Sequence, residues 1–124
     1  MKNDGSKLTD AELEIMHVVW ELDGGTVRQV HERLNQQRPL AYTTVMTMMN
    51  ILEEKGHLTR TKTGRAYRYE PVRPKSQVIS GMVDDFVGKV FEGSARPLVL
   101  SLVKDRKLSE KDLEEIARMI REVE

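Results

Sequence analysis

The sequence predicts a mostly α-helical fold with one small β-hairpin, divided into an N-terminal part of residues 1–73 and a C-terminal part of residues 74–124. Apolar side chains recur every three or four residues in several separate segments, which is the period of helices with a buried face. Residues 58–71 read instead as two strands around a glycine turn. Pro71 and Pro74 interrupt the pattern, and beyond them the chain contains only helical segments.

The first predicted helix has a complete start signal. Thr9 can cap it, Glu12 can reach back to the cap, and Leu8 and Leu13 flank them at the positions of a hydrophobic staple. We expect residues 1–7 to form a disordered tail and the helix to run to about Leu22, where Gly24-Gly25 ends it. The side chains expected to be buried are Leu13, Met16, Val19 and Trp20.

Two further helices are expected before the hairpin. One runs from about Val27 to Asn35 and buries Val27, Val30 and Leu34. Pro39 then forces a break, because the residue before a proline avoids helical conformation. The next helix spans residues 41–56 and ends at Gly56, which can adopt the left-handed conformation that closes a helix. Its apolar face carries Val45, Met48, Met49 and Leu52, and its opposite face carries the short uncharged side chains Thr43, Thr44, Thr47 and Asn50.

The hairpin that follows is cationic. It turns near Thr63-Gly64-Arg65, and Tyr67 and Tyr69 lie on one face of its second strand. Its positive side chains are Arg60, Lys62, Arg65 and Arg68. A thin polar helix beside such a hairpin predicts a winged helix-turn-helix, in which the helix enters a DNA major groove and the wing meets the neighbouring phosphates.

Positive charge is concentrated in this region. The chain has a formal net charge of +0, but residues 26–73 contain nine cations and four acids, a balance of +5. Residues 1–25 have a balance of −4, and residues 74–124 have a balance of −1. The segment predicted to read the groove is therefore electrostatically suited to nucleic acid, although the whole chain is neutral.

The groove contacts are predicted from the chemistry of the polar helix face. Threonine offers a hydroxyl to a phosphate or base and a methyl group to thymine, and asparagine can pair with adenine through two hydrogen bonds. Met46 could touch a thymine methyl group or pack in the core, and Tyr42 could donate to a phosphate or pack. The predicted DNA-binding residues are Tyr42, Thr43, Thr44, Met46, Thr47, Asn50, Arg60, Lys62, Arg65 and Arg68. The alternatives are a solvated helix face and an edge strand that its charges protect from aggregation.

The C-terminal part is expected to hold three helices. The first, about Lys75 to Glu92, has two adjacent apolar ridges where a surface helix needs one. The second surrounds residues 98–103, and the third starts near Leu108 with a shortened capping box at Ser109 and Asp112. About fifty residues rarely make an adequate core, so we predict a homodimer in which this part completes its core against a second copy. A monomeric three-helix bundle packed on the N-terminal part is the alternative. The predicted dimerisation residues are Val78, Met82, Phe86, Val90, Leu98, Leu102, Leu113, Ile116 and Ile120, of which the last three are expected to be buried.

Several function classes are excluded. The sequence has no cysteine, so it can form neither a disulfide nor a cysteine-based zinc site, which is consistent with a reducing cytoplasm. The three histidines have no metal-ligand spacing, and there is no glycine-rich phosphate loop or nucleophile elbow. No apolar run approaches the roughly 18 residues of a membrane span, and the first seven residues lack the apolar core of a signal peptide. We expect a soluble cytoplasmic protein that is not an enzyme and has no metal or cofactor.

Four runs of residues together resemble the penicillinase repressors of the BlaI and MecI type, which are related to the copper-responsive CopY repressors. The runs are Leu8-Thr9-Asp10-Ala11-Glu12-Leu13-Glu14-Ile15-Met16 with Val19-Trp20, Thr43-Thr44-Val45, Leu52-Glu53-Glu54-Lys55-Gly56, and Tyr67-Arg68-Tyr69-Glu70-Pro71. The resemblance extends from about residue 8 to the C-terminus. It implies a cytoplasmic homodimer that represses transcription from a palindromic operator, typically with TACA and TGTA half-sites, at β-lactam resistance-type genes. In the resistance systems it also implies inactivation by proteolysis, triggered by a membrane-bound antibiotic-sensing metalloprotease.

The sequence departs from this family in three places. Cleaved members have an Asn-Phe bond in the fifth helix, and the corresponding pair here is Ser101-Leu102. An arginine is common in the family where Ile51 stands. The Cys-x-Cys metal site of copper-responsive members cannot form in a chain without cysteine. Two other function classes stay open: an interaction adaptor that uses the winged fold without DNA, and a regulator with a small-molecule pocket between its two domains.

Overall fold

The computed structural model describes residues 7–123, so the predicted tail lies outside the described residues except for Lys7. The elements follow the order α1 (Asp10–Leu22), β1 (Gly25–Thr26), α2 (Val27–Asn35), α3 (Tyr42–Glu54), β2 (Leu58–Thr63), β3 (Ala66–Pro71), α4 (Lys75–Val90), α5 (Ala95–Lys104) and α6 (Glu110–Val123). The predicted mostly helical fold with a small hairpin is confirmed. The chain forms two units, one ending at Val78 and the other beginning at Ile79, so the boundary falls in the first turn of α4.

Side-chain caps fix where the first two helices begin. The Thr9 hydroxyl accepts a hydrogen bond from the Glu12 N–H at 3.1 Å, and Glu12 accepts one from the Thr9 N–H at 2.9 Å, which confirms the predicted capping box. A second box, between Thr26 and Gln29, starts α2. It was not predicted, although threonine followed three residues later by glutamine is a recognised start signal.

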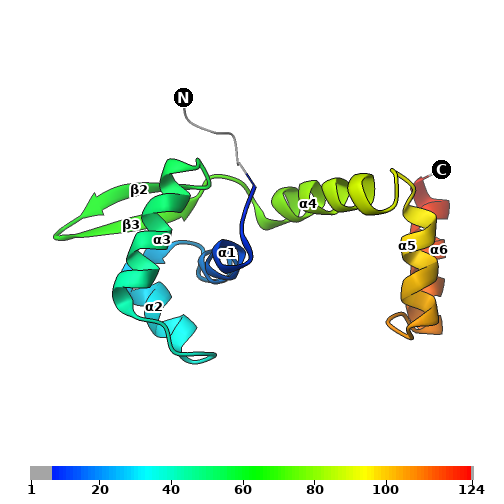
Figure 1. Cartoon of the computed structure of the whole chain (residues 1–124), viewed down its shortest axis with the longest axis horizontal. Helices are drawn as coiled ribbons and strands as arrows, with labels where there is room; N and C mark the ends of the chain where they lie inside the picture. The colour runs from blue at the N-terminus through cyan, green and yellow to red at the C-terminus, as the bar shows by residue number, and fades with distance from the viewer. Residues whose placement is uncertain (1–6, 124) are drawn as a thin grey trace. The chain divides into compact units, whose positions relative to one another are not determined.

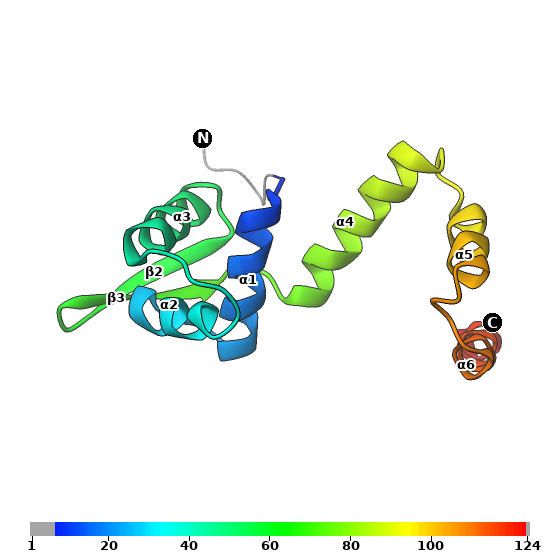
Figure 2. The same ribbon diagram turned by 60° about the horizontal axis from the view of Figure 1, so that its bottom comes forward.

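The sheet has three strands rather than the two expected. β1 pairs with β3 through Gly25↔Tyr69 and Thr26↔Arg68, so the strand order is β1-β3-β2. A strand of two residues is too short to show an alternating pattern, which is why the sequence did not reveal it. The hairpin closes at Thr63↔Ala66 around the predicted turn, where Gly64 has a φ of 64°. The hairpin extends beyond α1, α2 and α3 (Figure 1, Figure 2).

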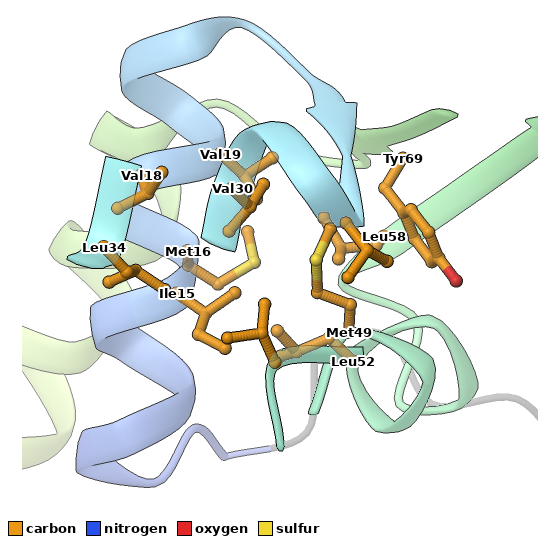
Figure 3. Packing of buried hydrophobic residues seen from close by; sticks show 12 residues of the cluster. Ile15, Met16, Val18, Val19, Val30, Leu34, Met49, Leu52, Leu58 and Tyr69 are labelled. Atoms are coloured by element: carbon orange, nitrogen blue, oxygen red, sulfur yellow. The ribbon is translucent and has the colours of Figure 1, made fainter. Parts of the chain in front are cut away.

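One apolar core lies between α1, α2, α3 and the sheet (Figure 3). It consists of Ile15, Met16, Val18, Val19, Val27, Val30, Leu34, Val45, Met49, Leu52, Leu58 and Tyr69. The predicted buried faces of α2 and α3 are confirmed, except that Met48 is half-buried. The face predicted for α1 is partly wrong, because Ile15 and Val18 are buried while Leu13 and Trp20 are half-buried. Trp20 lies at the edge of the core, where its indole N–H donates to the Arg73 carbonyl oxygen at 3.1 Å.

An ion pair joins α1 to the end of α3. The Lys55 Nζ donates to both carboxylate oxygens of Glu12, at 2.7 and 2.9 Å, and Glu12 is only 6% exposed. Burial acts to raise the pKa of Glu12, but the hydrogen bonds from Lys55 and Thr9 outweigh it and hold the pKa below its ordinary value of 4.5. The folded state therefore keeps Glu12 ionised at a pH where the unfolded chain takes up a proton.

We expect this pair to make stability depend on pH in the acid range. A carboxylate with a lowered pKa stabilises the folded state above its unfolded pKa, and that contribution is lost as the pH falls through the folded pKa. The thermal midpoint of the wild type should therefore drop as the pH is lowered below about 4.5. Glu12→Gln keeps the capping geometry and removes the charge, so its midpoint should fall less steeply. Glu54→Gln, at an exposed position of α3, is the matched control. If the thermal midpoints of Glu12→Gln and wild type fell equally steeply with pH, the Glu12–Lys55 pair would not be the source of the pH dependence.

The C-terminal unit has no buried core of its own among the described residues. No side chain of α4, α5 or α6 is buried. The expected burial of Leu113, Ile116 and Ile120 is therefore wrong for the single chain: Leu113 is half-buried, Ile116 is 39% exposed and Ile120 is 56% exposed. The shortened capping box at the start of α6 is confirmed, because Ser109 and Asp112 exchange hydrogen bonds at 2.9 and 3.0 Å. These helices are well formed and present apolar side chains to solvent.

Candidate nucleic-acid interface

The polar face of α3 is open to solvent. Thr43, Thr44 and Thr47 are exposed, while Val45, Met49 and Leu52 on the opposite side anchor the helix in the core. Because the apolar face of α3 is buried, its threonine face must point to solvent. Met46 is 38% exposed and lies outside the core, so core packing does not account for it.

The start of α3 is held by the turn that follows α2. The Leu40 N–H donates to Asn35 Oδ1 at 3.0 Å, and His31 Nε2 lies 2.7 Å from the Leu40 carbonyl oxygen. Tyr42 packs its ring edge-on against His31, with ring centroids 5.5 Å apart, and remains 46% exposed. Both expectations for Tyr42 therefore remain compatible with its position, since its ring packs and much of its side chain is accessible.

The register of the hairpin sorts its cations between two faces. Directly paired residues project to the same face of a sheet, and alternate residues along a strand share it. Arg60 pairs with Tyr69 and Lys62 pairs with Tyr67, so these four side chains lie on the face that also carries the core residue Leu58. This is the face toward α3. Arg65 is exposed in the turn itself.

A hydrogen-bond network links this face of the hairpin to α3. The Tyr69 hydroxyl donates to Asn50 Oδ1 at 2.6 Å, and Arg60 Nη1 donates to the same oxygen at 3.3 Å. The Arg60 guanidinium also lies over the Tyr67 ring, 4.4 Å from its centroid. The nearby Tyr69 hydroxyl, together with Tyr67 and Glu53, raises the pKa of Arg60 above its ordinary value. In Figure 3 the Tyr69 ring lies at the edge of the core with its hydroxyl pointing away from it.

Arg68 is not brought together with the other predicted cations. It pairs with Thr61, so it projects to the sheet face opposite Arg60 and Lys62. Its guanidinium Nη2 donates to the Asp23 carbonyl oxygen at 2.9 Å, and the side chain is half-buried. Gly24 has a φ of 97°, and a Cβ there would lie 2.9 Å from that nitrogen. A side chain at residue 24 would therefore collide with Arg68.

The remaining sequence-based candidates are also placed. Ile51 is exposed on α3, and Ser101 and Leu102 lie within α5, with Ser101 exposed and Leu102 half-buried. Tyr69 belongs to the core. Among residues 7–123, no group of three or more histidine, aspartate or glutamate side chains is arranged to hold a metal ion. In the same stretch no helix is both long enough and apolar enough to cross a membrane.

Sequence reasoning missed the link between Asn50, Arg60 and Tyr69. The pairing of Arg60 with Tyr69 could have been predicted. A two-residue turn at Gly64-Arg65 pairs Thr63 with Ala66, and that register pairs Arg60 with Tyr69. The contact with Asn50 depends on how α3 lies over the strands, and no local pattern encodes that.

A three-helix core with a cationic hairpin, and with the exposed polar face of its third helix beside that hairpin, defines a winged helix-turn-helix unit. The model of the penicillinase repressor family matches residues 8–122, so the chain belongs to that family. The matching relatives are named as transcriptional regulators and repressors, which confirms the prediction that the protein is not an enzyme.

Two relatives illustrate the extent of the similarity. The transcriptional regulator BlaI of Mycobacterium tuberculosis is 35% identical over 96 residues, which cover 77% of this chain and 70% of the relative. The penicillinase repressor of Bacillus licheniformis is 28% identical over 116 residues, which cover 94% of this chain and 91% of the relative. The similarity thus includes the C-terminal helices as well as the winged unit.

A solved structure matches the winged unit. It is the solution structure of the monomeric form of Bacillus licheniformis BlaI in complex with the blaP half-operator. The match has a TM-score of 0.51 and 33% sequence identity, and it covers 61% of this chain and 92% of that chain.

Proposed function

We propose that this protein is a transcriptional repressor that binds double-stranded operator DNA through α3 and the β2–β3 hairpin. The observation that carries the proposal is the exposed threonine face of α3 beside Arg60 and Lys62, held by a core that matches a BlaI unit solved with a half-operator. α3 would lie in the major groove, and Lys62 and Arg65 would contact phosphates beside it. Arg68 would serve mainly to hold the end of α1, because its guanidinium already donates a hydrogen bond to the Asp23 carbonyl oxygen.

We further propose that the protein acts as a homodimer, with residues 1–73 as the DNA-binding domain and residues 74–124 as the dimerisation domain. Support comes from the C-terminal helices, which leave Phe86, Val90, Ile116 and Ile120 exposed in the single chain. A second copy of the same helices would remove this apolar surface from water. Two-fold symmetry would then match a palindromic operator whose half-site centres lie about 34 Å apart, or a multiple of it.

Footprinting on the upstream region of the protein's own gene tests this proposal. We expect protection of an inverted repeat, and an affinity that falls steeply when salt is raised from about 50 to 200 mM, since a protein that neutralises several phosphates releases their counterions. Absence of a salt-sensitive complex would favour an interaction adaptor over a repressor. Such a repressor would act in the cytoplasm, where bacterial chromosomal DNA lies.

Thr47→Ala is expected to weaken specific binding while leaving the fold intact. Thr47 is exposed at the centre of the polar face of α3, so its loss removes a contact to a base edge worth about 1–3 kcal/mol. Titration of the footprinted operator and of a scrambled duplex, with thermal melting alongside, measures this. Thr59→Ala is the matched control, because Thr59 is exposed on the sheet face away from α3. Operator binding by Thr47→Ala equal to that of Thr59→Ala would mean that another part of α3 faces the groove.

We extend the proposal to regulation. The protein would control β-lactam resistance-type genes, as the name of the Bacillus licheniformis relative suggests, and a membrane-bound sensor metalloprotease would inactivate it by cutting at Ser101–Leu102. This bond lies inside α5, so cutting requires local opening of the helix. Mass spectrometry of the protein from cells exposed to a β-lactam should show a fragment ending at Ser101. An intact chain in cells whose resistance genes have been induced would count against cleavage.

A further inference from the structure

The Asn50 side chain is already engaged within the protein. Asparagine recognises adenine by using its carbonyl oxygen and its amide nitrogen together. The atom that contacts Arg60 must be the oxygen, because a guanidinium can only donate. That oxygen, Oδ1, receives both the Tyr69 hydroxyl at 2.6 Å and Arg60 Nη1 at 3.3 Å. The two-bond adenine contact expected from the sequence would therefore require these internal bonds to break.

Arg60 lies beside Asn50 and is available for a contact that Asn50 cannot make. Its guanidinium rests on Asn50, which lies one helical turn beyond Thr47 on the polar face of α3. The hydrogen bond to Asn50 is made by the Arg60 Nη1 atom. The Tyr67 ring, 4.4 Å from the guanidinium carbon, supports the other side of the group. A charged fork is thus held at the helix face that the proposed function directs into the groove.

A contact to phosphate alone does not need this arrangement. A flexible cation meets a phosphate from many directions, as lysine does, whereas a planar arginine fork adds geometric specificity. A side chain that is held before binding also loses less conformational freedom when it binds. The network around Arg60 therefore suits recognition of a fixed pair of acceptors, and the arginine fork matches O6 and N7 of guanine.

We propose that Arg60 is a specificity-determining residue that reads a guanine in each half-site, and that Asn50, Tyr67 and Tyr69 are positioning residues for it. This inference rests on the proposed function, since it names how the same surface selects its DNA. Tyr69 is the fixed point of the network: it is 2% exposed, so its ring is held by the core and its hydroxyl fixes Asn50. Tyr67 is 42% exposed, and it shields the guanidinium from one side.

Selection from a random-sequence duplex library tests the inference, because the DNA that the protein enriches itself reveals the operator. Wild type, Arg60→Ala and Lys62→Ala are each used to select DNA, and the base preference at every position is compared. We expect Arg60→Ala to lose preference at one guanine in each half-site, by about 5- to 150-fold, while other positions keep theirs. Lys62→Ala should weaken binding to all sequences alike, as loss of a phosphate contact does.

The outcomes separate the two proposals. If wild type enriches no sequence, the proposed function fails. If wild type enriches a palindrome and Arg60→Ala yields the same base profile, or loses affinity uniformly like Lys62→Ala, then the proposed function stands and Arg60 is only a phosphate contact.

Tyr69→Phe tests the positioning role. It keeps the buried ring and removes the hydroxyl that donates to Asn50, so the guanine preference should weaken several-fold in the same assay. Binding to non-specific DNA should stay unchanged, because the charge of Arg60 is kept. A purely structural role would instead lower the thermal midpoint and reduce binding to all DNA equally. Unchanged guanine preference in Tyr69→Phe would remove Tyr69 from the positioning network.

Discussion

Leu52→Ala is expected to lower the free energy of unfolding of the winged unit by about 2–5 kcal/mol. Leu52 is 0% exposed and lies on the buried face of α3 with Val45 and Met49. Alanine would lose the transfer free energy of the removed methyl and methylene groups and would leave a cavity that the surrounding side chains fill only in part. Urea unfolding followed by fluorescence measures the effect on this unit, because Trp20 is the single tryptophan of the chain and packs against this core.

Ile51→Ala is the matched control for this change. Ile51 precedes Leu52 in the same helix and is 37% exposed, so its truncation should alter the free energy of unfolding by no more than about 0.5 kcal/mol. Since Leu52 is 0% exposed and lies on the buried face of α3, it cannot touch DNA itself, and any loss of operator binding by Leu52→Ala should disappear at temperatures where the variant is fully folded. Equal destabilisation by the two variants would mean that α3 does not pack through the face described.

Local signals explain how much of the fold could be predicted from the sequence. Thr9 with Glu12, Ser109 with Asp112, and Gly64 each determine a helix start or a turn through atoms only a few residues apart. Such signals can be found without knowing the rest of the chain. β1 could not be found, because two residues become a strand only through pairing with Tyr69 and Arg68. The mistake at Leu13 and Trp20 has the same origin, since α2 and α3 decide which side of α1 is covered.

In the candidate site, too, the features set by local sequence were predictable and those set by tertiary packing were not. The exposed threonine face of α3 was predictable, because burial of Val45, Met49 and Leu52 determines what lies opposite them. The different situations of Arg60 and Arg68 were not, since both are arginines in one hairpin and only their strand register separates them. Asn50 lies on the polar face of α3 that the sequence predicted, but its hydrogen bond with the Tyr69 hydroxyl depends on tertiary packing. Sequence thus located the surface and left the assignment of individual contacts to the structure.

Ile120→Asp is expected to reduce affinity for a palindromic operator by about a hundred- to ten-thousandfold, which is the gain that linking two binding units provides. In the proposed dimer Ile120 faces the second copy, and a carboxylate there would have to be buried without a partner. In the single chain Ile120 is 56% exposed, so the change disturbs no internal core. Sedimentation at low micromolar concentration, with titrations of whole and half operators, measures the loss.

Affinity for the half operator is what makes this result interpretable. The winged unit carries the whole proposed DNA surface, so Ile120→Asp should bind a half operator as the wild type does while losing the advantage on the palindrome. Arg118→Asp places the same side chain on the face of α6 away from Leu113, Ile116 and Ile120, and it should remain dimeric. A wild type that sediments as a monomer, or an Ile120→Asp variant that remains a dimer, would show that these apolar faces do not join two copies. A loss on both DNA lengths would instead mean that α6 affects the winged unit itself.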